Sequence, residues 1–365
     1  MSLTPAVTAE LNLDALRSNL ARVRSLAPDS RVLAVIKADG YGHGLIRVAH
    51  ALVDADGFAV ARVEEGVALR RAAIGRRIVV LQGFNDREEL AALLTHRLEP
   101  VIHCAWQIDA LAGRSDVTIR PWLKLDTGMH RLGLTVKEFA SAVTRLAHLQ
   151  PRLMTHLACA DEPGHPATPD QLERFQRVTR HLSMAKSIAN SAAVLSWPES
   201  HADWVRPGLM LYGLSPFNQR SGPELGLTPV MTLKSRLVTI KSLPEGAAVG
   251  YGQSWTARRP TRLGLVSAGY GDGYPREIEA GTPVRIGAAL VPIVGRVSMD
   301  MLTVDLTDHP SIAPGNEVIL WGEGLPVETI AASAATIPYT LVCGVTARVQ
   351  RVERGQYHGT RESRL

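Results

Sequence analysis

Residues 32–44 read VLAVIKADGYGHG, and this stretch carries most of the information about the fold. Five apolar residues precede Lys37, and a glycine-rich turn follows it. A second run of this kind, IVVL at residues 78–81, also lacks polar alternation. Strands that are apolar throughout are buried on both faces, as in a parallel sheet covered by helices. The stretch therefore predicts a buried parallel strand with a lysine at its carboxyl end.

Short apolar runs alternate with helical patterns along the first 215 residues. The helical patterns have apolar residues three and four positions apart and lie at residues 63–73, 86–95, 135–149 and 169–185. The expected strands are 32–37, 57–62, 77–82, 100–104, 118–126, 153–158, 186–191 and 205–212. Eight such units in succession predict a (β/α)8 barrel, the TIM-barrel fold.

The pattern changes after about residue 228, where an alternation of period two begins to dominate. It is clearest in TLKSRLVTIKSL at residues 232–243 and in NEVILWG at residues 316–322. We expect a short helix at 327–335 and a last strand at 341–352. The chain is thus predicted to be an α/β protein of two domains, the barrel at 1–228 and a mostly antiparallel β domain at 229–365.

Composition excludes several classes of protein. Of 365 residues, 45% are hydrophobic and 21% charged, and the net charge is +5. No stretch approaches the roughly 18 apolar residues of a membrane-spanning helix, and the first residues do not read as a signal peptide. The cations do not cluster with aromatic residues as in nucleic-acid binders, and the three cysteines lack the spacing of a zinc site. We therefore expect a cytoplasmic protein without membrane, nucleic-acid or metal partners.

Polar side chains stand at the carboxyl ends of the predicted strands, where such a barrel builds its active site. From the first, fifth, sixth, seventh and eighth strands these are Lys37, Lys124 with Asp126, His156, Ser191, and Arg206 before Gly208. In a dry site ringed by cations the amine of Lys37 is favoured in its neutral form, which can form an imine with a carbonyl group. Alternatively, Lys37 extends into solvent from the end of its strand.

Two interpretations also remain open for the neighbouring residues. Ser191 and the backbone amides of Gly208 and Leu209 can form a phosphate site after the last two strands, or the segment is a loop shaped by proline and glycine. His156 is either part of the site or a histidine of the core.

Lys124 raises a separate question, because it is expected to point into the barrel and buried lysines rarely stand unpaired. Asp126 can neutralise it. Alternatively, a modification makes Lys124 anionic, so that it braces Arg131. The spacing of these three residues is compatible with both interpretations.

Eight sequence blocks, taken together and in this order, resemble alanine racemase, a pyridoxal-phosphate enzyme. They are AVIKADGYGHG (34–44), LKLDTGMHRLG (123–133), THLACADE (155–162), NSAA (190–193), VRPGLMLYG (205–213), VGYG (249–252), GYGDGYPR (269–276) and GRVSMDML (295–302). The resemblance implies a (β/α)8 barrel with a carboxyl-terminal β domain, which agrees with the fold expected from periodicity. It also implies pyridoxal 5′-phosphate as cofactor, alanine as substrate and a homodimer with shared active sites.

By this resemblance, Lys37 forms the imine with the cofactor and serves as the base on the D-alanine side. Tyr270 matches the base for L-alanine. Tyr270 and the residues around Met299 and Asp300 would reach the cofactor of the partner subunit. A pair of bases is needed because a single base that returns its proton to the same face regenerates the starting enantiomer.

The resemblance also assigns the cofactor contacts. The phosphate-binding positions are Tyr41, Ser191 and the backbone at Gly208 and Leu209. Arg206 would face the pyridine nitrogen, and Arg131 would lie near the phenolic oxygen and the substrate carboxylate. Lys124 falls on a lysine that is often carbamylated in the family. His156 and Arg206 are the groups expected to stabilise the ionised form of Tyr270.

The main departure from the family pattern is Ala347, which stands where some members have a phosphate-binding tyrosine. The expected role is the supply of D-alanine for peptidoglycan. A racemase of the same fold with a broader range of amino acids is the alternative. A small pyridoxal-phosphate-binding protein without catalysis would lack the second domain, and a decarboxylase of related architecture would release carbon dioxide.

Overall fold

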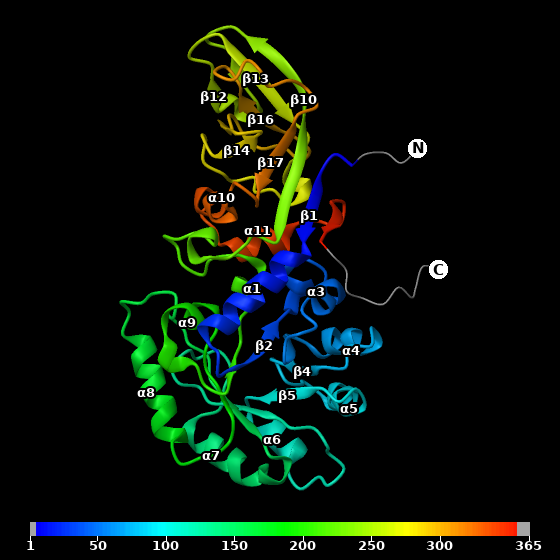
Figure 1. Cartoon of the computed structure of the whole chain (residues 1–365), viewed down its shortest axis with the longest axis vertical. Helices are drawn as coiled ribbons and strands as arrows, with labels where there is room; N and C mark the ends of the chain where they lie inside the picture. Colours follow the sequence, from blue (N-terminus) through cyan, green and yellow to red (C-terminus); the bar gives the residue numbers. More distant parts are fainter. Residues whose placement is uncertain (1–4, 356–365) are drawn as a thin grey trace. The chain divides into compact units, whose positions relative to one another are not determined.

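The computed structural model describes residues 5–355, which form two compact units (Figure 1). One unit comprises residues 17–211, and the other combines 5–16 with 212–355. The division differs from the expected boundary after residue 228 in two ways. Residues 5–16 belong to the β unit, because strand β1 (Thr8–Asn12) pairs with β10 (Met231–Leu243) and β18 (Gln350–Arg354). Ala9 and Leu11 are fully buried there, so hydrophobic burial holds the first strand in the β unit. Residues 212–228 belong to it as well, and the amides of Ser215 and Gly222 donate to Glu328 of the same unit.

Residues 17–211 form a closed barrel of parallel strands, which confirms the predicted fold class. In order the strands are β2 (Arg31–Val35), β3 (Gly57–Val60), β4 (Arg77–Val80), β5 (Glu99–Ile102), β6 (Trp122–Lys124), β7 (Arg152–Met154), β8 (Lys186–Ser187) and β9 (Trp204–Val205). Each strand ends earlier than predicted, although single backbone hydrogen bonds continue past the strand ends, such as the one from the amide of Ile36 to the carbonyl of Ala59. Lys37, His156 and Arg206 therefore lie just beyond the ends of β2, β7 and β9, whereas Lys124 is the last residue of β6.

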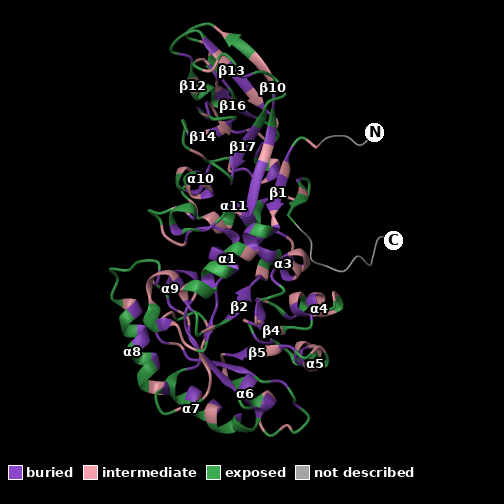
Figure 2. Ribbon diagram, viewed as in Figure 1, coloured by how far each residue is buried: buried purple, intermediate pink, exposed green. Residues whose placement is uncertain are grey.

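The helices of this unit follow the strands in alternation. They are α1 (Leu13–Leu26), which begins in the other unit, α2 (Lys37–Tyr41), α3 (Leu45–Ala51), α4 (Val63–Arg71), α5 (Arg87–Thr95), α6 (Ala105–Leu111), α7 (Val136–Arg145), α8 (Ala167–Thr179) and α9 (Ser191–Ser196). The four helical patterns found in the sequence correspond to α4, α5, α7 and α8. In Figure 2 the barrel strands are almost wholly buried, while α8 alternates between buried and exposed residues along its length. The helices thus cover the barrel with one apolar face each.

The amino-terminal ends of the strands are closed by large side chains. The rings of Trp122 and Trp204 lie 5.8 Å apart, and both are almost fully buried. Glu99 accepts hydrogen bonds from Trp122 and Arg152 on one carboxylate oxygen and from Arg77 on the other. This end of the barrel is packed, so any ligand site of the barrel belongs to the opposite end, where the strands finish.

Residues 5–16 and 212–355 form the β unit. Its main sheet has the order β15 (Ala289–Pro292), β14 (Pro283–Ile286), β17 (Glu317–Trp321), β10, β1 and β18, and β13 (Thr261–Val266) joins β10 to β16 (Leu302–Asp305). The strands β11 (Ala248–Val249) and β12 (Trp255–Thr256) form a separate hairpin. All these pairs are antiparallel except β1 with β18, as the predicted mostly antiparallel domain requires.

One expected strand of the β unit is wrong. Residues 341–352 were expected to form a single strand, but Pro338–Gly344 is helix α11 and the strand β18 begins at Gln350. Pro338 stands at the first position of α11, where its fixed φ favours helix. The expected helix at 327–335 is confirmed as α10 (Val327–Ser333). Between residues 5 and 355, no helix combines the length and apolar character needed to cross a membrane.

Candidate active site

Lys37 follows the buried end of β2 and opens the short helix α2. The next three residues, Ala38, Asp39 and Gly40, all have φ between 52° and 60°, a region that residues with a side chain seldom adopt. Two carboxylates hold this turn: Glu65 accepts a hydrogen bond from the amide of Ala38 at 2.7 Å, and Asp39 accepts one from the amide of Leu45 at 2.7 Å. The half-buried Lys37 thus stands on a strained and firmly held backbone.

Arg206 forms the polar centre of the barrel mouth. Its side chain is 4% exposed, and its guanidinium donates to the hydroxyl of Ser187 at 2.7 Å and to the carbonyl of Thr155 at 2.6 Å. It also donates to the carbonyl of Ile188 and lies 3.3 Å from Nδ1 of His156. Burial lowers the pKa of Arg206 to about 10, yet the group remains charged at neutral pH.

The electrostatic interactions show which groups share this end of the barrel. Burial, followed by the charges of Arg206 and Arg131, lowers the pKa of Lys124 to about 8. Burial and the charge of Arg206 likewise hold the pKa of His156 well below its ordinary range, with further contributions from Lys124, Arg131 and Lys37. The structure therefore brings four cationic side chains and a neutral histidine together, as the strand ends indicated.

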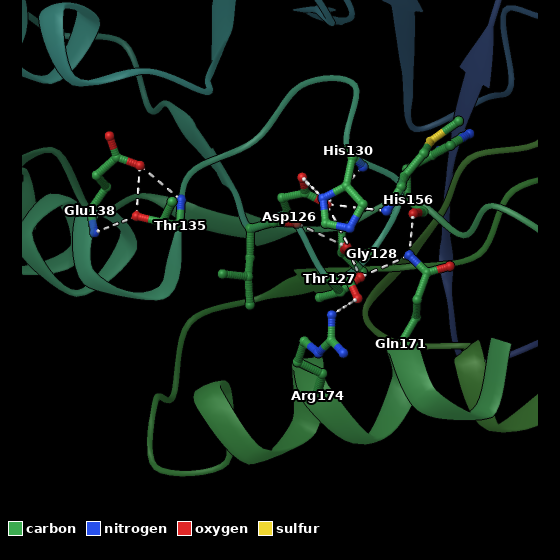
Figure 3. A network of polar contacts seen from close by, with 12 residues as sticks. Asp126, Thr127, Gly128, His130, Thr135, Glu138, His156, Gln171 and Arg174 are labelled. Carbon is green, nitrogen blue, oxygen red and sulfur yellow. Dashed lines mark hydrogen bonds and ion pairs between the residues drawn. The ribbon is translucent and has the colours of Figure 1, made fainter. Parts of the chain in front are cut away.

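The carboxylate of Asp126 binds the backbone of the turn after β6. One of its oxygens accepts hydrogen bonds from the amides of Gly128, Met129 and His130, and the other lies 3.2 Å from Nδ1 of His130 (Figure 3). Within residues 5–355 no ion pair joins Asp126 to Lys124, although its charge opposes the lowering of the pKa of Lys124. Asp126 therefore does not form the ion pair with Lys124 that was one of the two interpretations of the sequence.

A compact cradle lies at the ends of β8 and β9. The hydroxyl of Ser191 accepts hydrogen bonds from the amides of Gly208 at 2.9 Å and Met210 at 3.3 Å. A Cβ atom at Gly208 would lie 2.5 Å from the hydroxyl of Tyr41, so a larger residue does not fit there. Leu209 begins a 3-10 turn directly after Gly208. The phosphate-binding positions implied by the resemblance thus meet at one place in the barrel.

A buried polar network supports this end of the barrel from α8. Gln171 donates to the hydroxyl of Thr127 and to the carbonyl of His156, both at 3.0 Å (Figure 3). Thr127 and Thr155 are joined through their hydroxyls at 2.8 Å, and Arg174 donates to the carbonyl of Thr127. The network ties the turns after β6 and β7 to α8, so it fixes the backbone that carries Lys124 and His156.

In the β unit, Tyr270 opens a turn that follows β13. Its amide donates to the carbonyl of Ser298, and the amide of Gly271 donates to the carbonyl of Met299 at 2.8 Å. Tyr270 is 37% exposed and Met299 53% exposed. The structure thus places Tyr270 beside the loop that contains Met299 and Asp300.

Both units match models of one family. The model described as "Alanine racemase, N-terminal domain" matches residues 11–216, and "Alanine racemase, C-terminal domain" matches residues 230–353. The chain belongs to the alanine racemase family. This confirms the resemblance found in the sequence, and it makes the chain an isomerase of the alanine racemase type.

Relatives of known sequence and structure cover nearly the whole chain. Alanine racemases from Shewanella sediminis and Nitrosococcus oceani are 47% and 49% identical to it, each over 94% of this chain and 98% of the relative. The crystal structure of the biosynthetic alanine racemase from Pseudomonas aeruginosa has a TM-score of 0.92 and 45% identity, and covers 96% of this chain and 100% of the relative. The alanine racemase from Bartonella henselae, whose structure contains covalently bound pyridoxal phosphate, has a TM-score of 0.87 and 28% identity over 96% of this chain and 100% of its own.

The barrel residues fit the pyridoxal phosphate on which this alanine racemase family depends. The group carries a phosphate dianion, a phenolic oxygen and an aldehyde, and the barrel mouth offers several cations, hydroxyls and an amine. At Gly208 the hydroxyl of Tyr41 approaches the backbone so closely that no side chain fits, and the hydroxyl of Ser191 accepts a hydrogen bond from the Gly208 amide. Arg131 and Arg206 supply positive charge that an anionic group requires.

Sequence reasoning missed the residues that hold the site together. Glu65 accepts a hydrogen bond from the amide next to Lys37. Thr155 and Ser187 accept hydrogen bonds from Arg206, and Gln171 donates to the carbonyl of His156. Of these, Ser187 lies within one predicted strand and Thr155 precedes His156 in another, so both positions could be found from the sequence. Gln171 lies on the buried face of a long amphipathic helix, and the sequence contains no signal for its role.

Proposed function

We propose that this chain interconverts L-alanine and D-alanine by a two-base proton transfer in which Lys37 and Tyr270 act on opposite faces of the substrate. The observation that carries the proposal is the cluster of Lys37, Lys124, Arg131 and Arg206 around a neutral His156. Such a site favours an anionic cofactor and an amino-acid carboxylate. The similarity to alanine racemases over nearly the full length supports alanine as the substrate.

Lys37 would hold pyridoxal phosphate by its aldehyde, and Tyr41, Ser191 and the backbone at Gly208 and Leu209 would hold the phosphate. When bound, this cofactor supplies an electron sink that stabilises a carbanion at Cα of the amino acid. Arg131 would pair with the substrate carboxylate, and Arg206 would face the pyridine ring.

Lys37 and Tyr270 would then move the proton. We assign Lys37 to the face from which D-alanine loses its α-proton and Tyr270 to the face of L-alanine. His156 stays neutral at pH 7 because burial and the surrounding cations lower its pKa. A neutral imidazole that accepts at Nδ1 from Arg206 donates at Nε2, which suits it to stabilise an ionised tyrosine.

Tyr270 would come from the partner subunit of a homodimer, together with Met299 and Asp300. The exposure of Tyr270, Met299 and Met301 supports this proposal, since clustered exposed apolar side chains mark interfaces. Lys124, whose pKa of about 8 leaves much of its amine neutral under mildly alkaline conditions, would add to carbon dioxide and release a proton to solvent, giving a carbamate anion that pairs with Arg131. We further propose that the enzyme works in the cytoplasm and supplies D-alanine for peptidoglycan.

Incubation of the purified holoenzyme with L-alanine in heavy water tests the proposal. We expect D-alanine to form, with deuterium at Cα of the product. Assays with serine, lysine and arginine in parallel distinguish an alanine racemase from one of broader specificity. Cofactor binding without deuterium exchange or D-alanine would identify a cofactor carrier, and release of carbon dioxide would identify a decarboxylase.

A further inference from the structure

Arg348 joins the turn of Tyr270 to the neighbouring loop of the β unit. Its Nε atom donates to Oδ1 of Asp272 at 2.7 Å, and Nη1 donates to Oδ1 of Asp300 at 2.8 Å. Nη2 donates to the carbonyl of Met299 at 3.3 Å. One planar guanidinium thus contacts two carboxylates and one carbonyl from two separate loops.

Asp272 transmits this contact to the backbone beside Tyr270. It is buried, and its second oxygen, Oδ2, accepts a hydrogen bond from the amide of Gly269 at 2.9 Å. Arg348 also lies directly against Gly271, because a Cβ atom there would lie 2.7 Å from Nη2. Residues on both sides of Tyr270 are therefore held through Arg348 or through the carboxylate that it binds.

Thr346, two residues before Arg348, also contacts this turn through its side chain and its backbone. The hydroxyl of Thr346 donates to the carbonyl of Gly271 at 2.8 Å, and the amide of Thr346 donates to the carbonyl of Asp272 at 3.1 Å. The side chain of Arg348 is 46% exposed, so its ion pairs contribute little to global stability. Their geometry restricts the position of one turn instead.

We propose that Arg348 is a positioning residue that holds the Tyr270 turn against the loop of Met299 and Asp300, so that the phenol is kept in place for proton transfer. This inference rests on the proposed function of Tyr270 as the base for L-alanine. It assigns to Arg348 a role that acts through the backbone of the Tyr270 turn.

Primary isotope effects measured with α-deuterated L-alanine and α-deuterated D-alanine test this role. In Arg348→Gln we expect kcat/KM to fall about 10- to 100-fold, the range for a catalytic group misplaced by about 1 Å. Because the step at Tyr270 alone would slow, the isotope effect should rise with deuterated L-alanine and fall with deuterated D-alanine. Arg348→Lys should change both values in the same directions by less, since lysine keeps the charge but loses the planar fork.

Arg259→Gln is the matched control, because it breaks the exposed ion pair of Arg259 with Asp308 elsewhere in the β unit. It should leave both isotope effects unchanged. Hydrogen exchange provides a readout that is independent of catalysis. The amides of Tyr270 and Gly271 should exchange at least several-fold faster in Arg348→Gln than in the wild type or in Arg259→Gln.

Each outcome separates the two proposals. If Tyr270→Phe racemises at the full rate, the proposed function of Tyr270 is wrong whatever Arg348 does. If Tyr270→Phe loses activity but Arg348→Gln and Arg348→Lys alter neither the isotope effects nor the exchange, the positioning role is wrong. Isotope effects are ratios, so they do not depend on how much of a variant folds, and Arg348→Lys decides the matter should Arg348→Gln be insoluble.

Discussion

Nη2 of Arg206 lies 3.3 Å from Nδ1 of His156, inside a shell of buried acceptors. Because a guanidinium has no acceptor, Nδ1 of His156 must be the unprotonated nitrogen and Nε2 must carry the proton. Burial and the charge of Arg206 also hold the pKa of His156 well below its ordinary range. His156 is therefore a neutral imidazole in a single tautomer. The guanidinium keeps this tautomer because all of its nitrogens donate and none accepts, and its several N–H groups also reach the neighbouring acceptors.

Replacement of Arg206 by lysine should therefore be disruptive although it keeps the charge. A single ammonium cannot reach the hydroxyl of Ser187, the carbonyl of Thr155 and the carbonyl of Ile188 as the guanidinium does. At least one buried acceptor would lose its partner, at a cost of about 1–3 kcal/mol in the free energy of unfolding. Urea denaturation of the apoprotein measures this loss, and an unchanged midpoint and slope would contradict it.

Lys124 should make the stability of the apoprotein depend on pH. Its pKa is about 8 in the folded state and 10.5 as the ordinary value, so between these pH values the unfolded chain binds a proton that the folded chain does not. The free energy of unfolding therefore rises with pH across this window, by at most about 3.5 kcal/mol at 1.4 kcal/mol per pH unit. Below pH 8 the lysine is charged in both states and the penalty is complete.

Lys124→Met is the matched variant for that measurement. In buffers free of carbon dioxide, wild type and variant should differ most at pH 7, where the variant is more stable, and should converge toward pH 10.5. Chemical denaturation at four or five pH values gives the difference directly. A difference that stays constant with pH would show that Lys124 does not titrate in this window.

Gly208→Ala should weaken cofactor binding without unfolding the barrel. The added methyl group would lie 2.5 Å from the hydroxyl of Tyr41, so the cradle must open or the tyrosine must move. We expect the Kd for pyridoxal phosphate to rise at least about 10-fold, equivalent to roughly 1.4 kcal/mol. Gly75→Ala, at a position with no atom within 4 Å of the new Cβ, is the control and should bind normally. Absorbance titration of the apoprotein measures both, and equal affinities would refute the cradle.

Tyr270→Phe should affect the two enantiomers differently. Without the phenol, racemisation should fall by about 10²- to 10⁴-fold, the usual contribution of a positioned base. Exchange of the α-proton of D-alanine with heavy water should persist, because Lys37 remains in place. Nuclear magnetic resonance of each enantiomer in heavy water tests this, and equal loss of exchange from both would argue against a separate base for each face.

The fold could be predicted from periodicity because its signals are local. Continuous apolar runs such as 32–36 specify buried parallel strands, and the change to period two after residue 228 marks the second unit. The pairing of β1 with β10 could not be predicted, because it joins residues more than 200 positions apart. Thr8–Asn12 does alternate between half-buried and buried residues, but five residues are too few to identify their sheet.

The site was predictable to the extent that parallel strands bring their carboxyl ends together. That rule gathers Lys37, Lys124, His156 and Arg206 without any knowledge of side-chain contacts. Two features lay beyond it. The carboxylate of Asp126 turns toward three backbone amides, and Gln171 reaches the site from the middle of α8. Both depend on the conformations of turns and on tertiary packing, which leave no mark on hydrophobic periodicity.

Reduction of the holoenzyme with borohydride, followed by tryptic digestion and mass spectrometry, tests the central claim most directly. If Lys37 holds the cofactor, the reduced adduct blocks cleavage at that lysine, and its mass appears on the single peptide that spans residues 32–47. An adduct on any other lysine, or an unmodified Lys37 in protein shown to contain the cofactor, would contradict the account.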